Sequence, residues 1–142
     1  MKKLLSILLA ILGLFVFVAC GEQEQTNGRN VTVTVEKQEN VVAITVTELS
    51  GEYKLDEVMT VLQEKGELTF TVADGAITSI DGVENAANWN PCWMCYTSDG
   101  ELSNADWGTY EWKGETLGSA TLGATALPVI EGGVYLWVYA GY

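Results

Sequence analysis

The segment from Trp89 to Trp112 contains the residues best suited to chemistry. Cys92 and Cys95 have the Cys-x-x-Cys spacing of redox pairs, disulfides and half metal sites. On a strand their Cα atoms would lie about 10 Å apart with side chains on opposite faces, whereas a disulfide needs about 7 Å or less. A closed zinc site needs four N or S ligands, and the chain has no His. Strand geometry thus favours reduced packing cysteines, and leaves a bridge in a bent segment or redox or metal chemistry as alternatives.

Aromatic rings are the other feature of this segment, which holds most of the chain's five Trp residues. Trp and Tyr combine an apolar body with a polar group, so they suit binding sites that are partly open to water. Loops beside such rings are common places for binding sites. We expect a rim that holds a flat ligand, formed by rings among the following residues: Trp89, Trp93, Tyr96, Trp107, Tyr110 and Trp112.

Catalytic patterns find little support in the sequence. No His is present to act as a base, and neither a Gly-x-Ser-x-Gly elbow nor a phosphate-binding Gly loop occurs. The acidic residues Asp99, Glu101 and Asp106 do not have the spacing of a compact calcium loop. We therefore expect a protein that is not an enzyme, with no metal site and no cofactor.

The first 29 residues have the pattern of an export and anchoring signal. Two Lys precede an apolar run from Leu4 to Val18, which is shorter than the about 20 residues of a transmembrane helix. A small residue then precedes Cys20. This pattern resembles bacterial lipoprotein signals, which implies removal of residues 1–19, a lipid on Cys20 and a polar tether over residues 20–29. The expected location is the extracytoplasmic face of the cell membrane. The alternative is an ordinary signal peptide that ends by chance at a Cys.

Net charge excludes one class of partner. The chain has 7 basic and 19 acidic residues, and removal of the two Lys in the signal leaves a formal charge of −14. Nucleic acid binding needs basic patches, so we expect no nucleic acid partner. The same charge disfavours a domain that lies flat on an anionic membrane surface, which leaves the lipid anchor as the membrane contact. Residues 30–142 have the length of a single domain.

Hydrophobic periodicity predicts an α+β domain. Val31–Val35 and Val42–Thr47 alternate between apolar and polar residues across a short polar link, which predicts an antiparallel hairpin. From Lys54 to Lys65, apolar residues recur at i, i+3, i+4 and i+7, which predicts an amphipathic helix that a following Gly can end. Leu68–Val72 and Ala76–Ile80 return to the alternation of strands.

The last strand is predicted at Val134–Tyr139. Alternation in the last strand separates an aliphatic face from an aromatic face. Aliphatic side chains pack readily against a helix, so we expect the aliphatic face in the core and the aromatic face free to meet a loop, a partner or a ligand. The two faces contain the following residues: Val134, Leu136 and Val138; Tyr135, Trp137 and Tyr139.

The segment Glu101–Ala126 offers an alternative fate for the aromatic face, because it could fold over that face and bury it. Within the segment, Leu102–Asp106 has the composition of a polar loop, and Trp107–Gly114 alternates like a strand or hairpin arm. Gly118–Ala126 is rich in small residues and is expected to be irregular, with at most a short strand.

Three short segments stand in order around the predicted helix: Ile77–Gly82, Trp93–Tyr96 and Gly132–Tyr139. They resemble a family of bacterial surface lipoproteins, with a domain of unknown function, that is similar to the C-terminal β-domain of transcobalamin and intrinsic factor. The resemblance spans about residues 30–142. It implies a β-grasp-like mixed sheet with one packed helix and a strand at Cys92–Tyr96. It also implies a corrinoid as a candidate ligand, because the best-known animal members contact a corrinoid with this domain.

Two functional hypotheses follow. In the first, the protein is a membrane-anchored extracytoplasmic lipoprotein that captures a corrinoid or another planar small molecule on its aromatic rim. In the second, it is a surface adhesion or assembly module whose aromatic face docks a protein or a glycan. Burial of the rings distinguishes them, because a rim closed by loops would remove the main reason for a small-molecule site.

Overall fold

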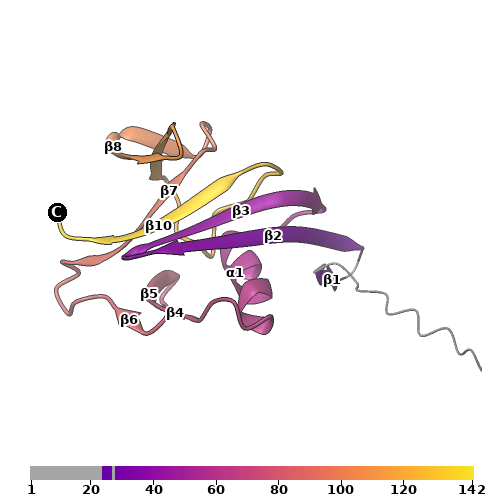
Figure 1. Ribbon diagram of the computed structural model, residues 1–142, viewed down its shortest axis with the longest axis horizontal. Helices are drawn as coiled ribbons and strands as arrows, with labels where there is room; N and C mark the ends of the chain where they lie inside the picture. The colour runs from indigo at the N-terminus through magenta and orange to yellow at the C-terminus, as the bar shows by residue number, and fades with distance from the viewer. Residues whose placement is uncertain (1–23, 27) are drawn as a thin grey trace, which may run out of the picture.

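A computed structural model describes residues 24–26 and 28–142 (Figure 1). The predicted signal over residues 1–19 and the predicted lipid site Cys20 lie outside the described residues. Within the described part, no helix has the length and apolar character that a membrane span requires. The described residues form one helix and ten strands in this order: β1 Glu24–Thr26, β2 Arg29–Gln38, β3 Val41–Ser50, α1 Leu55–Glu64, β4 Phe70–Ala73, β5 Ala76–Ile80, β6 Val83–Glu84, β7 Cys92–Thr97, β8 Ser103–Trp112, β9 Glu115–Ala120 and β10 Val134–Ala140.

The strands form two sheets, so the domain belongs to the expected α+β class. The larger sheet has seven strands in the order β1-β2-β3-β10-β7-β9-β8, and the smaller one has the order β4-β5-β6. The expected mixed sheet is wrong, because every strand pair among the described residues is antiparallel. The last strand, β10, is inserted between β3 and β7 and runs opposite to both.

The predicted hairpin is confirmed and is longer than expected. β2 pairs with β3 from Asn30 opposite Ser50 to Gln38 opposite Val41, with Asn40 at a positive φ of 60° in the turn. Asn tolerates that conformation better than most residues. Part of the segment expected to be a tether is also a strand, because β1 pairs with the start of β2.

The helix agrees with its prediction to within one residue at each end. Its predicted apolar positions are fully buried, and they are Leu55, Val58, Met59 and Leu62. The carboxylate of Glu57 accepts the N–H of Lys54 at 2.7 Å, which satisfies one donor that the first turn leaves free. Gly66, at a φ of +74°, donates to Gln63 O and ends the helix.

Two apolar clusters lie on opposite faces of the large sheet. The helix-side core lies between α1 and the sheet, and the hairpin-side core lies under the hairpin of β8 and β9 (Figure 1). Alternation along β3 and β10 sends neighbouring residues to different clusters. From these two strands the helix-side core takes Val42, Ile44, Val46, Tyr135 and Trp137, and the hairpin-side core takes Val41, Ala43, Leu136 and Val138.

This arrangement reverses the expected faces of the last strand. Tyr135 and Trp137 are 0% and 4% exposed in the helix-side core, and Tyr139 packs against that core. The aliphatic face, with Leu136 and Val138, instead contacts the hairpin of β8 and β9. Large rings fill the space between sheet and helix, whereas shorter side chains suit the opposite face, where the hairpin supplies its own ring in Trp112.

The hairpin of β8 and β9 corrects one loop prediction and confirms another. The expected polar loop Leu102–Asp106 is mostly the first half of β8. Gly118–Ala126 agrees with its prediction, because only its first three residues belong to a strand, the end of β9, and the rest is irregular. The register of the pair shifts between Asn104 and Thr109, so the ladder contains an irregularity that alternation along β8 does not reveal. The alternative that the segment covers the aromatic face is correct in part: Trp112 and Leu117 of its two strands pack against the aliphatic face, whereas Leu102, Ala120 and Ala124 pack in the helix-side core with Tyr135 and Trp137.

Candidate functional site

A cleft of about 320 Å³ opens where β9 diverges from β7 in the large sheet. β9 pairs with β7 only at Tyr96 and Thr97, whereas β10 pairs with β7 from Cys92 onward. Beyond Ala120 the chain leaves the sheet and crosses to the turn after β4, where Gly123 approaches the carbonyl of Gly75 so closely that a Cβ would lie 3.0 Å from it. The cleft is lined by Ala76, Ile77, Trp89, Trp93, Met94, Cys95, Ser119, Ala120, Thr121, Leu122, Gly123, Ala124 and Trp137.

Trp89 forms the outer wall of the cleft and is 47% exposed. Its φ of 62° lies in the left-handed region, which costs a bulky residue about 1–2 kcal/mol. Hydrogen bonds on both sides hold this conformation. Trp89 N–H donates to Ala86 O at 2.8 Å. The side chain of the next residue, Asn90, donates to Tyr142 O and accepts Tyr142 N–H. Strained residues of this kind cluster at binding and catalytic sites.

Trp89 also borders a more polar hollow of about 230 Å³. That hollow is lined by Thr71, Thr78, Glu84, Asn85, Ala86, Ala87 and Trp89. The exposed indole therefore stands between an apolar cleft and a polar one. A ligand stacked on this ring could extend to either side.

Trp93 forms part of the inner wall and is 8% exposed. Its indole Nε1 donates to Val83 O at 2.8 Å, and its backbone N–H donates to Asn85 Oδ1 at 2.8 Å. Its ring lies 5.3 Å from the ring of Tyr139, centre to centre, in a tilted arrangement. Trp93 is thus a rigid wall whose polar group is already occupied.

Trp137 completes the inner wall and differs from Trp93 in one respect. Its side chain is 4% exposed, and its indole Nε1 has no hydrogen-bond partner among the described residues. A buried donor without an acceptor costs about 1–3 kcal/mol, and most buried indoles find one. Trp137 was expected on the aromatic face of the last strand but not among the rings of the rim.

The remaining predicted rings lie elsewhere. Tyr96 and Tyr110 pack with each other at 5.8 Å on the hairpin side, and Trp112 is buried in the hairpin-side core at 9% exposure. Trp107 is 64% exposed on β8, outside the lining of the cleft. Of the six expected rings the structure therefore brings two to the cleft, Trp89 and Trp93.

The cysteines lie on the strand that the resemblance implies, and they are free, as strand geometry favours. Both are free, Cys92 is buried, and the strand places them on opposite faces. Burial raises the pKa of the Cys92 thiol and raises that of Cys95 to about 12. Both are therefore neutral thiols at physiological pH, which makes them poor nucleophiles.

Metal-binding groups are not assembled in the part of the chain that the structure describes. No cluster there has three or more His, Cys, Asp or Glu side chains able to hold a metal ion. The acidic loop instead serves local structure, because Asp99 Oδ1 accepts the N–H of Glu101 at 3.0 Å. Such a bond is typical of an Asx turn.

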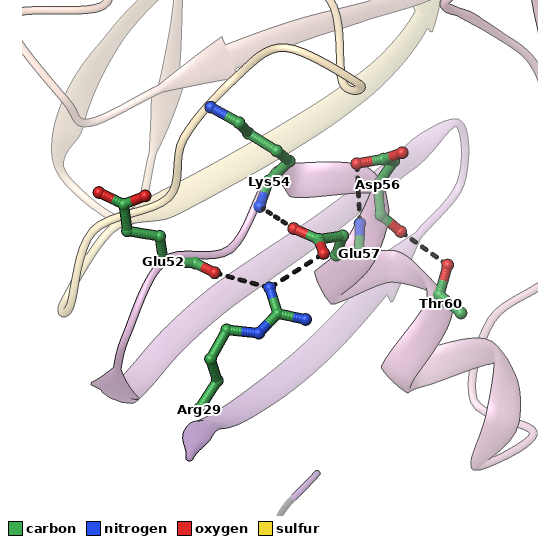
Figure 2. Close-up of polar contacts among 6 residues, drawn as sticks. All are labelled: Arg29, Glu52, Lys54, Asp56, Glu57 and Thr60. Atoms are coloured by element: carbon green, nitrogen blue, oxygen red, sulfur yellow. Dashed lines mark hydrogen bonds and ion pairs between the residues drawn. The ribbon is translucent and has the colours of Figure 1, made fainter. Parts of the chain in front are cut away.

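A second hollow, of about 410 Å³, lies at the start of α1. Figure 2 shows the polar contacts around it, in which Arg29 Nη1 donates to Glu52 O at 2.8 Å and to Glu57 Oε1 at 3.0 Å. The Arg29 guanidinium also lies over the ring of Tyr53, 4.4 Å from its centre. The hydrogen bond from Lys54 N–H is the largest cause that holds the pKa of Glu57 below its ordinary value, and the hydrogen bond and charge of Arg29 lower it further.

The first turn of α1 is closed to an outside anion. Leu55 N–H and Asp56 N–H donate to the carbonyls of Leu127 and Ala124, at 2.9 and 3.1 Å. Glu57 N–H donates to Asp56 Oδ1, and burial raises the pKa of the Asp56 carboxyl. We interpret this second hollow as a structural junction between β2 and α1.

Comparisons of the chain with protein-family models, with curated proteins and with solved structures gave no match.

The sequence contains one further signal for the cleft. Gly118–Ala126 consists of small residues, and such a stretch beside a Trp-rich strand leaves open space where larger side chains would fill it. Trp137 was harder to place, because its contribution depends on which face of β10 meets α1.

Proposed function

We propose that this protein is a lipid-anchored, extracytoplasmic binding module that captures a ring-containing small molecule without chemical conversion. The β-grasp likeness, with one helix packed across a sheet, and the lipid on Cys20 belong to the same proposal. The single observation that carries it is Trp89, a half-exposed indole held at a positive φ on the wall of an apolar cleft. An indole in this position offers a flat surface for stacking, and strained residues of this kind cluster at binding and catalytic sites.

The dimensions of the cleft restrict the ligand. A volume of about 320 Å³ is at the lower end for sites that hold drug-sized molecules. One ring system therefore fits inside, and the rest of a larger ligand would stay outside or extend to the polar side of Trp89. In the corrinoid version of the proposal, only one part of the corrinoid enters the cleft.

Trp89→Ala gives the size of the expected effect. The exposed 47% of this side chain corresponds to about 120 Å² of surface, and a stacked ring would cover roughly half of it. At about 25 cal/mol per Å², this loss amounts to about 1.5 kcal/mol, or about tenfold in affinity. Trp107→Ala is the matched control, because Trp107 is also exposed and lies outside the cleft lining.

The experiment is a fluorescence titration of the purified protein with cobinamide and with a panel of uncharged aromatic compounds. Binding that weakens about tenfold in Trp89→Ala and is unchanged in Trp107→Ala supports the proposal. Absence of Trp quenching by cobinamide at tens of micromolar removes the corrinoid version. Absence of a response to every compound contradicts the small-molecule proposal.

A second candidate is a surface adhesion or assembly module that docks a protein or a glycan. The observation that favours it is Trp107, which is 64% exposed on β8 with no role in either core. For this function the two variants exchange roles, because Trp107→Ala would abolish docking while Trp89→Ala would spare it. Surface binding of immobilised glycans or cell-wall proteins by the two variants separates the candidates.

A further inference from the structure

The polar hollow beside Trp89 is built on one face of the small sheet. The register of that sheet places Thr71 opposite Ser79 and Ser79 opposite Glu84, and directly opposed side chains lie on the same face. Thr71 Oγ1 lies 2.8 Å from Ser79 Oγ and 2.7 Å from Thr78 Oγ1. The Glu84 carboxylate therefore shares a face with these hydroxyl groups, and that face lines the hollow.

The backbone that carries the Glu84 carboxylate is held on both sides. On one side, β6 pairs with β5. On the other side, Trp93 Nε1 donates to Val83 O and the Tyr139 hydroxyl donates to Glu84 O, both at 2.8 Å. The position of Glu84 is thus fixed before a ligand arrives, which lowers the entropy cost of binding.

The charge of the hollow favours a cation. Glu84 is exposed, and no basic side chain of the described residues lines the hollow. The ion pairs of Arg29, Lys37 and Lys113 are made with other carboxylates. The chain has a formal charge of −12, so its field attracts cations and repels anions. The half-exposed indole of Trp89 adds a second attraction, because Trp is the best aromatic partner for a cation.

We propose that the hollow binds a protonated amino group, so that the captured molecule is a ring-containing organic amine. Its ring lies in the apolar cleft on one side of Trp89. Its ammonium group reaches the hollow on the other side and lies between the indole and the Glu84 carboxylate. The hydroxyl oxygens of Thr71 and Thr78 are further acceptors for its N–H groups. This inference rests on the proposed function and adds the charge that selects the ligand.

Three compounds of similar shape isolate the effect of charge. At pH 7 phenethylamine is a cation, phenethyl alcohol is neutral and phenylacetate is an anion. Full-length protein with ¹⁵N-labelled Trp gives one indole N–H signal for each of the five Trp residues, and Trp89→Phe identifies the signal of Trp89 by its loss. A cation–π contact and an exposed ion pair are each worth about threefold in affinity. We therefore expect phenethylamine to bind about tenfold more tightly than phenethyl alcohol, and phenylacetate to bind most weakly.

Glu84→Gln removes the charge of the hollow and keeps the shape of the side chain. We expect it to weaken phenethylamine about threefold and to leave phenethyl alcohol unchanged. Glu115→Gln is the matched control, because Glu115 is an exposed carboxylate on β9 that lies outside the hollow, and its loss changes the net charge equally. An equal loss of phenethylamine affinity in the two variants would mean that net charge attracts the amine, and would overturn the inference.

The remaining outcomes separate this inference from the proposed function. If phenethylamine and phenethyl alcohol move the Trp89 signal with equal affinity, the charge inference is wrong and ring capture stands. If N-acetylglucosamine moves the Trp89 signal at lower concentration than phenethylamine does, the hollow is a glycan site and the inference is overturned. If none of the three ring compounds moves that signal, the proposed function fails for rings of this size and the inference fails with it.

Discussion

Replacing Tyr135 by Phe removes one oxygen atom from the helix-side core and leaves the ring in place. Tyr135 is 0% exposed, and its hydroxyl accepts the backbone N–H of Ile130 at 2.8 Å. Burial raises the pKa of this hydroxyl from its ordinary value of 10.0 to about 12. The substitution therefore has two separable effects, one from the lost acceptor and one from the lost titration.

The two effects have opposite signs at high pH. Loss of the acceptor leaves Ile130 N–H in a partly buried site without its partner, which costs about 1 kcal/mol at pH 7. The pKa of the Tyr135 hydroxyl is higher in the folded protein than in the unfolded chain. Its protonated form therefore stabilises the fold fully below pH 10, and this contribution is lost as the pH rises toward 12. A difference of about two pKa units corresponds to about 3 kcal/mol. Tyr135→Phe is thus expected to be the less stable protein at pH 7 and the more stable one near pH 12.

Urea unfolding followed by far-UV circular dichroism, at intervals from pH 7 to pH 11.5, measures this crossover. Other groups that titrate in this range, such as Cys95, are present in both proteins, so their contributions largely cancel in the difference. At pH 7 the expected loss lowers Tm by about 4 °C for a domain of this size. A free-energy difference that stays constant from pH 7 to pH 11.5 would refute the buried hydroxyl and, with it, the placement of the aromatic face against α1.

Three further predictions test the rest of the structure. Trp112→Ala is expected to cost about 3–5 kcal/mol in urea unfolding because it empties the hairpin-side core, while Trp107→Ala changes stability by about 0.5 kcal/mol or less. Glu57→Gln is expected to lower the free energy of unfolding by up to about 1 kcal/mol at pH 7 and by less at pH 3. The lowered pKa of the Glu57 carboxyl means that its charged form stabilises the fold above pH 4.5 and that this contribution is lost on acidification. Urea unfolding at both pH values measures the difference. Cys92 and Cys95 are expected to react with a disulfide reagent at pH 8 far more slowly than in urea-unfolded protein, because burial keeps both thiols protonated.

Local pattern was sufficient for most of the secondary structure. The helix follows from apolar spacing between Lys54 and Lys65, and its cap at Lys54 and stop at Gly66 need only their immediate neighbours. The hairpin of β2 and β3 likewise depends on two alternating runs and a turn. These elements were predictable because the contacts that define them are close in sequence.

Elements that depend on distant pairing were predicted less well. The first half of β8 contains Asn104 and Asp106, whose polarity resembles that of a loop, and it is a strand because β9 lies beside it. The β-strand order was equally out of reach, since β10 enters between β3 and β7, which are far from it in the chain. Alternation within a strand does not indicate which other strand pairs with it.

The site shows the same limit at the level of a single strand. Alternation separates Tyr135 and Trp137 from Leu136 and Val138, but both sets are apolar, so the pattern is symmetric with respect to which set meets the helix. What decides the orientation is the element that packs on each face of β10, which is α1 on one side and the β8–β9 hairpin on the other. Because the rings face α1, Trp137 lies beside Trp93 in the inner wall of the cleft. Had the aliphatic face met the helix, Trp137 would lie under the hairpin, and the cleft would lose one of the two buried rings of its inner wall.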